Sequence, residues 1–334
     1  MRPGRATVRG LLGQVRGLRR RGTGAGWRRA AAPGGVGPSR PRPEFTEADG
    51  PLPPRLPEVL AETEHVVAIS KPAGMPFHHA GGDPGVPQVL RRMQREGLLD
   101  WKGELLSVHR LDRVTSGGWD THAPAEGGHG ADTHAAAAAS GVMLFAKSQA
   151  AATDISCRFS QREVTKYYSA LSRRKPSKKQ GRVVGDMKKG RRGGWKLLRE
   201  QTNPAVTSFV SRGVESSLPG LRFFLLRPTT GRTHQLRVAM KALGAAVYGD
   251  PLYSDGLEEA EEDRCYLHAS AVRLTVLGEP FQVVCRPDQD GQGPLWPATE
   301  DWPFPAGLED NHGPWFPELP TLRCDRFGGS GERA

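Results

Sequence analysis

A single carboxylate stands between two arginines in the stretch SVHRLDRVTSGG, residues 107–118. Asp112 has Arg110 on one side and Arg113 on the other, and the turn-forming sequence Thr-Ser-Gly-Gly follows at once. A nearby guanidinium keeps a carboxylate ionised at neutral pH, and it also attracts phosphate groups. The stretch therefore predicts a loop that holds an anionic catalytic group beside a polyanionic substrate.

A second charge pattern points to the same kind of substrate. From Lys147 to Arg199 there are sixteen Lys and Arg residues but only three acidic ones, and the run 173–196 concentrates the positive charge next to Trp195. Basic residues clustered beside aromatic ones are typical of nucleic-acid binding. By itself such a run is equally compatible with a solvated loop.

The amino-terminal segment differs from the rest of the chain. Residues 1–43 contain eleven arginines and no acidic residue, so they carry the whole net charge of +11. This composition predicts an organelle transit peptide, with mitochondrion and chloroplast both left open. The alternative is a disordered basic arm on a cytoplasmic protein. The four cysteines show no CxxC spacing, and no apolar run is long enough to span a membrane.

The predicted strands and helices that would position these residues occur in mixed order, without a regular βαβ alternation. This order indicates an α+β fold with a mixed, largely antiparallel central sheet and flanking helices. We expect a leader over 1–55, a catalytic domain over 56–287 and a Pro/Trp-rich tail over 288–334. Apolar patterns predict strands at 65–70, 141–148, 205–211, 221–228, 266–277 and 281–287. They also predict a helix at 88–97 that ends at Gly97, a helix capped by Ser148, and a helix at 234–244 that ends at Gly244.

Four segments occur in a characteristic order: KPAGMP, HRLDRVTSG, KYYSAL and PTTGRTHQLRVAMKALGAAVYGDPLY. Together they resemble the RluA family of RNA pseudouridine synthases over roughly residues 60–287. The resemblance implies the pseudouridine synthase fold and the isomerisation of uridine to pseudouridine within ribosomal or transfer RNA. It implies neither a metal nor an organic cofactor. It further suggests a monomer whose partner is RNA, with no membrane and no obligate protein partner.

The resemblance also assigns site residues. The essential carboxylate of the family maps onto Asp112, its conserved arginine onto Arg237 and its tyrosine onto Tyr168. We expect Arg237 to pair with Asp112, and Tyr168 to stack on the extruded base while Tyr167 points to the other face of its strand. The alternatives are a structural turn for Asp112, a helix-surface role for Arg237 and an ordinary core position for Tyr168.

Several basic residues are candidates for contacts with RNA phosphate, although structural ion pairs are a close alternative for those near the loop. We expect His109 and His234 to be hydrogen-bonded scaffolding. Three histidines in a Gly/Ala-rich tract, His122, His129 and His134, do not predict a metal site. The candidate RNA contacts are Lys71, Arg110, Arg113, Lys188, Lys189, Arg191, Arg192 and Arg232.

The chain departs from the family pattern at one place. Residues 117–140 separate Ser116 from Gly141, so that either Gly117 or Gly141 can serve as the glycine of the motif. This segment is either a solvent-looped insertion or intron sequence kept in an erroneous gene prediction. It leaves open a non-catalytic RNA-binding or ribosome-assembly protein. A third, less favoured reading is a hydrolase that uses Asp112. An S4-type RNA-binding module is not visible.

Overall fold

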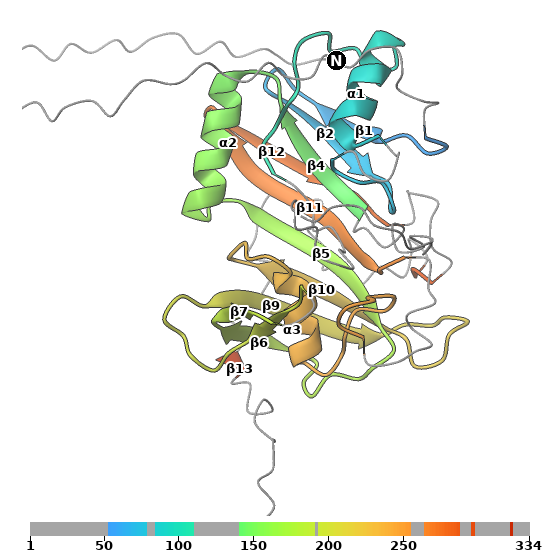
Figure 1. Cartoon of the computed structure of the whole chain (residues 1–334), viewed down its shortest axis with the longest axis vertical. Helices are drawn as coiled ribbons and strands as arrows, with labels where there is room; N and C mark the ends of the chain where they lie inside the picture. The colour runs from blue at the N-terminus through green and yellow to red at the C-terminus, as the bar shows by residue number, and fades with distance from the viewer. Residues whose placement is uncertain are drawn as a thin grey trace, which may run out of the picture. The chain divides into compact units, whose positions relative to one another are not determined.

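The computed structural model describes residues 53–78, 84–109, 140–190, 193–254, 264–287, 295–297 and 321–322 (Figure 1). All of them belong to one compact unit, Asp49–Ala334. The expected leader, most of the expected tail, and the segment that contains Asp112 lie outside the described residues. Within the described ranges, no helix is both long and apolar enough to cross a membrane.

A mixed sheet forms the centre of the molecule, with the strand order β1-β2-β4-β11-β5-β10-β9-β6-β13. Neighbouring strands run antiparallel except in two pairs, β4–β11 and β6–β13. This confirms the predicted α+β class. The strands of this order are β1 (Glu58–Glu62), β2 (Val66–Lys71), β4 (Ser140–Ala146), β5 (Thr165–Ser172), β6 (Gln180–Gly185), β9 (Ala205–Gly213), β10 (Arg222–Pro228), β11 (Leu267–Val276) and β13 (Thr321–Leu322). β3 (Leu106–Ser107) pairs with β4, and β12 (Glu279–Val284) pairs with β11.

The three predicted helices are present as α1 (Val86–Arg95), α2 (Gln149–Gln161) and α3 (Gln235–Ala242). The Oγ atom of Ser148 caps α2 by accepting the N–H of Ala151 at 3.2 Å. Gly97 and Gly244 follow α1 and α3 with φ of 75° and 71°, a left-handed conformation that favours glycine. The sequence signals for the helix ends are therefore confirmed.

The helices cover both faces of the sheet. Residues of α1 and α3 pack on the face that carries Ala170, Leu226 and Ala269. Residues of α2 pack on the opposite face against β4, β11 and β12. In Figure 1, α1 lies near β1 and β2, and α3 lies near β9 and β10. The face shared by α1 and α3 therefore has one helix toward each end of the strand order.

The basic run 173–196 contains more regular structure than its sequence suggests. It forms β6 and a separate hairpin of β7 (Met187–Lys189) and β8 (Trp195–Leu197). Lysines alternate here with few apolar residues, so the pattern resembles a solvated loop, although β6 pairs with β9 along six residues. In the tail, Trp296 is buried against Phe223 and Tyr266.

Candidate active site

One row of the sheet brings three segments of the site together. Across five neighbouring strands, the aligned residues are Lys71, Gly141, Ala269, Tyr168 and Leu226. Lys71 comes from KPAGMP, Gly141 from the end of the segment that contains Asp112, and Tyr168 from KYYSAL, whereas Ala269 lies on β11 and Leu226 on the strand before GRTHQLR. The sheet therefore gathers at one level what the sequence spreads over more than half of the chain.

Tyr168 lies between Ala269 and Leu226 in this row and faces the side of the sheet that carries α1 and α3. Its ring is partly buried and packs against both the cluster beneath α1 and the cluster beneath α3. Tyr167 is buried on the opposite face, as predicted from strand alternation, and burial raises its pKa to about 12. Of the two rings, Tyr168 is thus the one that shares a face with the helix of Arg237.

Arg237 on α3 is fully buried and held by a carboxylate that we did not predict. Its Nε donates to Oδ2 of Asp250 at 2.7 Å, and its Nη2 donates to Oδ1 at 2.6 Å. Asp250 is also fully buried, and its Oδ1 accepts the N–H groups of Leu252 and Tyr253. Burial disfavours the charged guanidinium, but the hydrogen bond and charge of Asp250 outweigh it and raise the pKa of Arg237. The positive charge is therefore permanent.

The remaining nitrogen of Arg237 is available for another acceptor. Its Nη1 is buried and has no hydrogen-bond partner among the described residues. A buried donor left without an acceptor costs about 1–3 kcal/mol, so this position favours an anionic or polar group beside it. The ring of Tyr253 lies 4.8 Å from the guanidinium carbon and covers part of the charge. Arg237 is therefore a core cation with one free donor, which excludes the helix-surface alternative.

His234 precedes α3 and is neutral at pH 7. Its Nδ1 shares a hydrogen bond of 2.9 Å with the hydroxyl of Tyr253, which also accepts the N–H of Trp195 at 2.7 Å. Burial, and then the charge of Arg237, lower the pKa of His234 to about 4. This contact confirms the expected scaffolding role, and it ties the basic β7–β8 hairpin to the environment of Arg237.

The amide of Gln235 fixes the loop that leads into α3. Its Oε1 accepts from Oγ1 of Thr230 at 2.7 Å and from the N–H of Arg232 at 3.0 Å. Its Nε2 donates to the carbonyl of Val206 and to Oγ1 of Thr207, both at 3.0 Å. All four hydrogen-bonding positions of one buried amide are satisfied. The TGRTHQ sequence is thereby attached to β9, and the start of α3 has a defined orientation.

The described residues on both sides of the segment that contains Asp112, His109 and Gly141, are attached to the sheet. The Nε2 atom of His109 accepts the N–H of Leu144 at 3.0 Å, so the proton of the neutral ring is on Nδ1. Burial, and then the charge of Lys166, lower the pKa of His109 to about 4. At the other end, Gly141 lies in the row with Tyr168. The pairing of Asp112 with Arg237 involves a residue outside the described ranges and stays a prediction.

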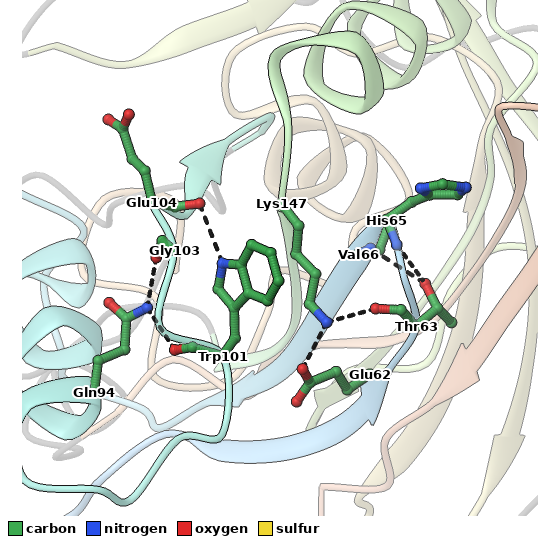
Figure 2. A network of polar contacts seen from close by, with 9 residues as sticks. All are labelled: Glu62, Thr63, His65, Val66, Gln94, Trp101, Gly103, Glu104 and Lys147. Atoms are coloured by element: carbon green, nitrogen blue, oxygen red, sulfur yellow. Dashed lines mark hydrogen bonds and ion pairs between the residues drawn. The ribbon is translucent and has the colours of Figure 1, made fainter.

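A further network of polar contacts stabilises the connection from α1 to β3, which leads to His109 (Figure 2). Nε2 of Gln94 donates to the carbonyls of Trp101 and Gly103 at 2.8 and 2.7 Å. The Nζ atom of Lys147 donates to Glu62 at 2.6 Å and lies 4.7 Å from the centre of the Trp101 ring. A Cβ at Gly103 would come within 2.5 Å of that ring. The connection from α1 to β3 is therefore fixed on both sides before the chain reaches the loop.

The predicted RNA-contacting residues are placed in different surroundings. Lys71 is only 3% exposed, and its Nζ donates to the carbonyls of Pro72 and Met75, which stabilises the KPAGMP turn. Arg232 is half-buried and donates to the side chain of Asn203. Lys188 and Lys189 are exposed on β7. Arg110, Arg113, Arg191 and Arg192 lie outside the described residues, and RNA contact stays a prediction for the whole set.

Sequence reasoning missed three residues of the site: Asp250, Gln235 and Tyr253. A signal for Asp250 was present, because it is the only acidic residue between Arg237 and Tyr253, and a buried arginine needs a carboxylate. The roles of Gln235 and Tyr253 depend on contacts with β9 and β8, which are distant in sequence.

Comparisons with known proteins support one interpretation of this geometry. Residues 137–242 match the family model described as RNA pseudouridylate synthase. The chain is 36% identical over 239 residues to an uncharacterized RNA pseudouridine synthase of Haemophilus influenzae, covering 72% of this chain and 90% of the relative. It is 30% identical over 221 residues to the dual-specificity RNA pseudouridine synthase RluA of Escherichia coli, covering 65% and 86%. The structure of human RNA pseudouridylate synthase domain containing 1 aligns with a TM-score of 0.53 and 21% identity, covering 75% and 94%, and supports the fold.

Proposed function

The chain belongs to the RluA family of RNA pseudouridine synthases, and on that premise we propose that it isomerises specific uridines of ribosomal or transfer RNA with Asp112 as its catalytic carboxylate. As an enzyme of this family, it is an RNA-modifying isomerase. The observation that carries the residue assignment is the row in which Tyr168 and Gly141, the described end of the segment containing Asp112, both pair with Ala269 of β11.

The reaction requires a glycosidic bond to be exchanged without loss of atoms. The bond from C1′ to N1 breaks, the uracil turns, a bond from C1′ to C5 forms, C5 loses its proton and N1 gains one. A uridine in folded RNA must first be extruded, which costs a few kcal/mol and is offset by stacking on an aromatic face. Tyr168, partly buried between the α1 and α3 clusters, is the ring that we assign to this stacking.

We assign Arg237 the role of keeping the catalytic carboxylate ionised and oriented. Its permanent charge, its bidentate attachment to Asp250 and its Nη1, which has no partner in the part of the chain that the structure describes, support this role. Asp112 follows His109 by three residues, which span at most about 11 Å of chain. The carboxylate is therefore tied to the part of the sheet where His109 binds β4.

We assign RNA binding to the hairpin of β7 and β8. Lys188 and Lys189 are exposed there, and phosphate neutralisation by lysine and arginine supplies most of the affinity of such surfaces. The hairpin is attached to the site because the N–H of Trp195 donates to the hydroxyl of Tyr253, whose ring covers Arg237. RNA bound by these lysines would thus lie next to the residues assigned to catalysis.

The arginine-rich residues 1–43 support an organelle location, in which the substrate would be mitochondrial or chloroplast RNA. Fusion of residues 1–43 to a fluorescent protein tests this: import into one organelle is expected, and a cytoplasmic signal would contradict it. Light scattering of the purified chain tests the expected monomer.

The test of the activity uses unmodified transcripts of ribosomal and transfer RNAs that carry tritium at uridine C5. The wild-type chain is expected to release tritium and to form pseudouridine, whereas Asp112→Asn is expected to bind the same RNA and release none. RNA binding without product from the wild type would support the non-catalytic RNA-binding protein. Release of free uracil would support the hydrolase.

A further inference from the structure

Between Asp112 and Val142 the chain contains two Ser–Gly pairs, at 116–117 and at 140–141, and either can supply the end of the loop that begins at His109. The sequence alone does not distinguish them, because both follow Asp112 and the second stands at the start of the apolar strand β4. The contacts of Ser140 and Gly141 provide the distinction.

Gly141 occupies a position that only glycine can fill. Its φ is 106°, a backbone conformation that residues with a Cβ rarely adopt. A Cβ at this position would lie 2.3 Å from the carbonyl oxygen of Ala269 and 2.7 Å from its nitrogen. Because both are backbone atoms of a central strand, they cannot move aside. The close approach of β4 to β11 beside Tyr168 therefore depends on this glycine.

Ser140 is the centre of a fully buried chain of hydrogen bonds. Its Oγ accepts from Nη2 of Arg264 at 3.2 Å and lies 2.8 Å from Nδ1 of His268. Nε2 of His268 lies 3.1 Å from the carbonyl of Cys285. A carbonyl can only accept, so Nε2 carries the proton, and Nδ1 accepts from the hydroxyl of Ser140. Ser140 and His268 are both 0% exposed, so the chain of bonds is protected from water.

The protonation state of His268 fits this direction. Burial is the main reason that the pKa of His268 is lowered to about 3; the hydrogen bond to the carbonyl of Cys285 opposes burial, and the charges of Arg264 and Lys71 add smaller lowering effects. The ring is therefore neutral at pH 7 and offers Nδ1 as an acceptor. The serine hydroxyl has one orientation, which fixes the point where the segment from His109 joins β4.

We propose that Ser140–Gly141, and not Ser116–Gly117, is the functional end of the loop that carries Asp112, and that Ser140 and His268 are positioning residues for that loop. The inference rests on the proposed function of Asp112. It implies that residues 116–139 are inserted inside the loop, upstream of a Ser–Gly pair that is attached to the sheet.

The test compares matched substitutions at the two pairs. Ser140→Ala removes the central hydroxyl, Ser116→Ala makes the same change at the other pair, and Ser172→Ala is the control for loss of a buried hydroxyl elsewhere in the sheet. Ser172 is fully buried on β5, and its hydroxyl accepts one hydrogen bond, from the N–H of Arg174. The tritium-release assay gives kcat and KM for each variant, and thermal unfolding gives its stability.

A misplaced catalytic group reduces the chemical step by roughly tenfold to a hundredfold. We expect Ser140→Ala to lower kcat by at least about tenfold with KM for the labelled RNA nearly unchanged, because no RNA-contacting residue is altered. Ser116→Ala and Ser172→Ala are expected to keep kcat within about twofold. A purely structural role for Ser140 would instead give Ser140→Ala and Ser172→Ala the same kcat, and that result would overturn the inference.

A second variant keeps the test decisive if Ser140→Ala does not fold. The double substitution Ser116→Ala with Gly117→Ala is expected to leave kcat within about twofold of wild type. A large loss of kcat there would show that the first pair is the functional one. An inactive wild-type chain would instead contradict the proposed function. Failure of this inference, seen as a loss of kcat in the first-pair variant, is therefore distinguishable from failure of the proposed function, seen as an inactive wild type.

Discussion

Two buried histidines, His234 and His268, and the partly buried His109 make the stability of this protein dependent on pH. His109 and His234 have pKa values lowered to about 4, and His268 to about 3, in each case chiefly by burial. In the unfolded chain, each returns to its usual value of 6.5. Between these values the unfolded state binds more protons than the folded state. The free energy of unfolding is therefore fully retained above pH 6.5 and decreases as the pH falls toward 4.

The size of the effect follows from the number of protons. One histidine that stays neutral in the folded state costs about 1.4 kcal/mol for each pH unit below its unfolded pKa. At pH 5.5 three such groups cost about 4 kcal/mol relative to pH 7, or about 3 kcal/mol when the share of the partly exposed His109 is discounted. Typical domains are stable by only about 5–15 kcal/mol, so this loss is readily measured.

Urea unfolding followed by tryptophan fluorescence at pH 7.5, 6.5 and 5.5 measures this dependence. We expect two to three protons to be taken up on unfolding near pH 5.5, and His109→Gln, whose amide can still accept from Leu144, to reduce this uptake by about one. An uptake below one proton near pH 5.5, or a stability that rises with acid, would refute the reasoning.

Three further outcomes are expected. Asp250→Asn leaves the buried charge of Arg237 without its carboxylate and should cost about 3–5 kcal/mol in urea unfolding; a loss below about 1 kcal/mol would contradict the importance of the pair. Deletion of 117–140, which joins Ser116 to Gly141 in the place of Ser140, should preserve or increase tritium release, because loop length itself has a small entropic effect; complete loss would show that the segment is integral. The double variant Lys188→Ala, Lys189→Ala should weaken binding to the labelled RNA. It should also make the slope of log affinity against log salt concentration less steep by the equivalent of about two phosphate contacts, whereas an unchanged slope would place the RNA elsewhere.

Local signals in the sequence predicted the elements well. The glycines after α1 and α3, the capping Ser148 and the alternation of Tyr167 with Tyr168 depend on the backbone within a few residues, and the structure has all of them. The motifs also predicted the family and the α+β class. Such features need no knowledge of which segments meet in space.

Features that depend on distant contacts were not predictable in the same way. The strand character of β6, for example, follows from its pairing with β9. The carboxylate that holds Arg237 is Asp250, whereas we expected Asp112; a buried cation can have more than one neighbour, and sequence spacing does not rank them. The pairing with Asp112 stays a prediction.

The position of β11 determines when this molecule can become active during its synthesis. Residues 267–276 are translated after α3, yet they insert between β4 and β5 in the middle of the strand order. Until they leave the ribosome, β1-β2-β4 and β5-β10-β9-β6 are two half-sheets without their shared neighbour. Such long-range pairing is slow to form. A nascent or truncated chain that ends before β11 would therefore contain every signature motif and still have no assembled site.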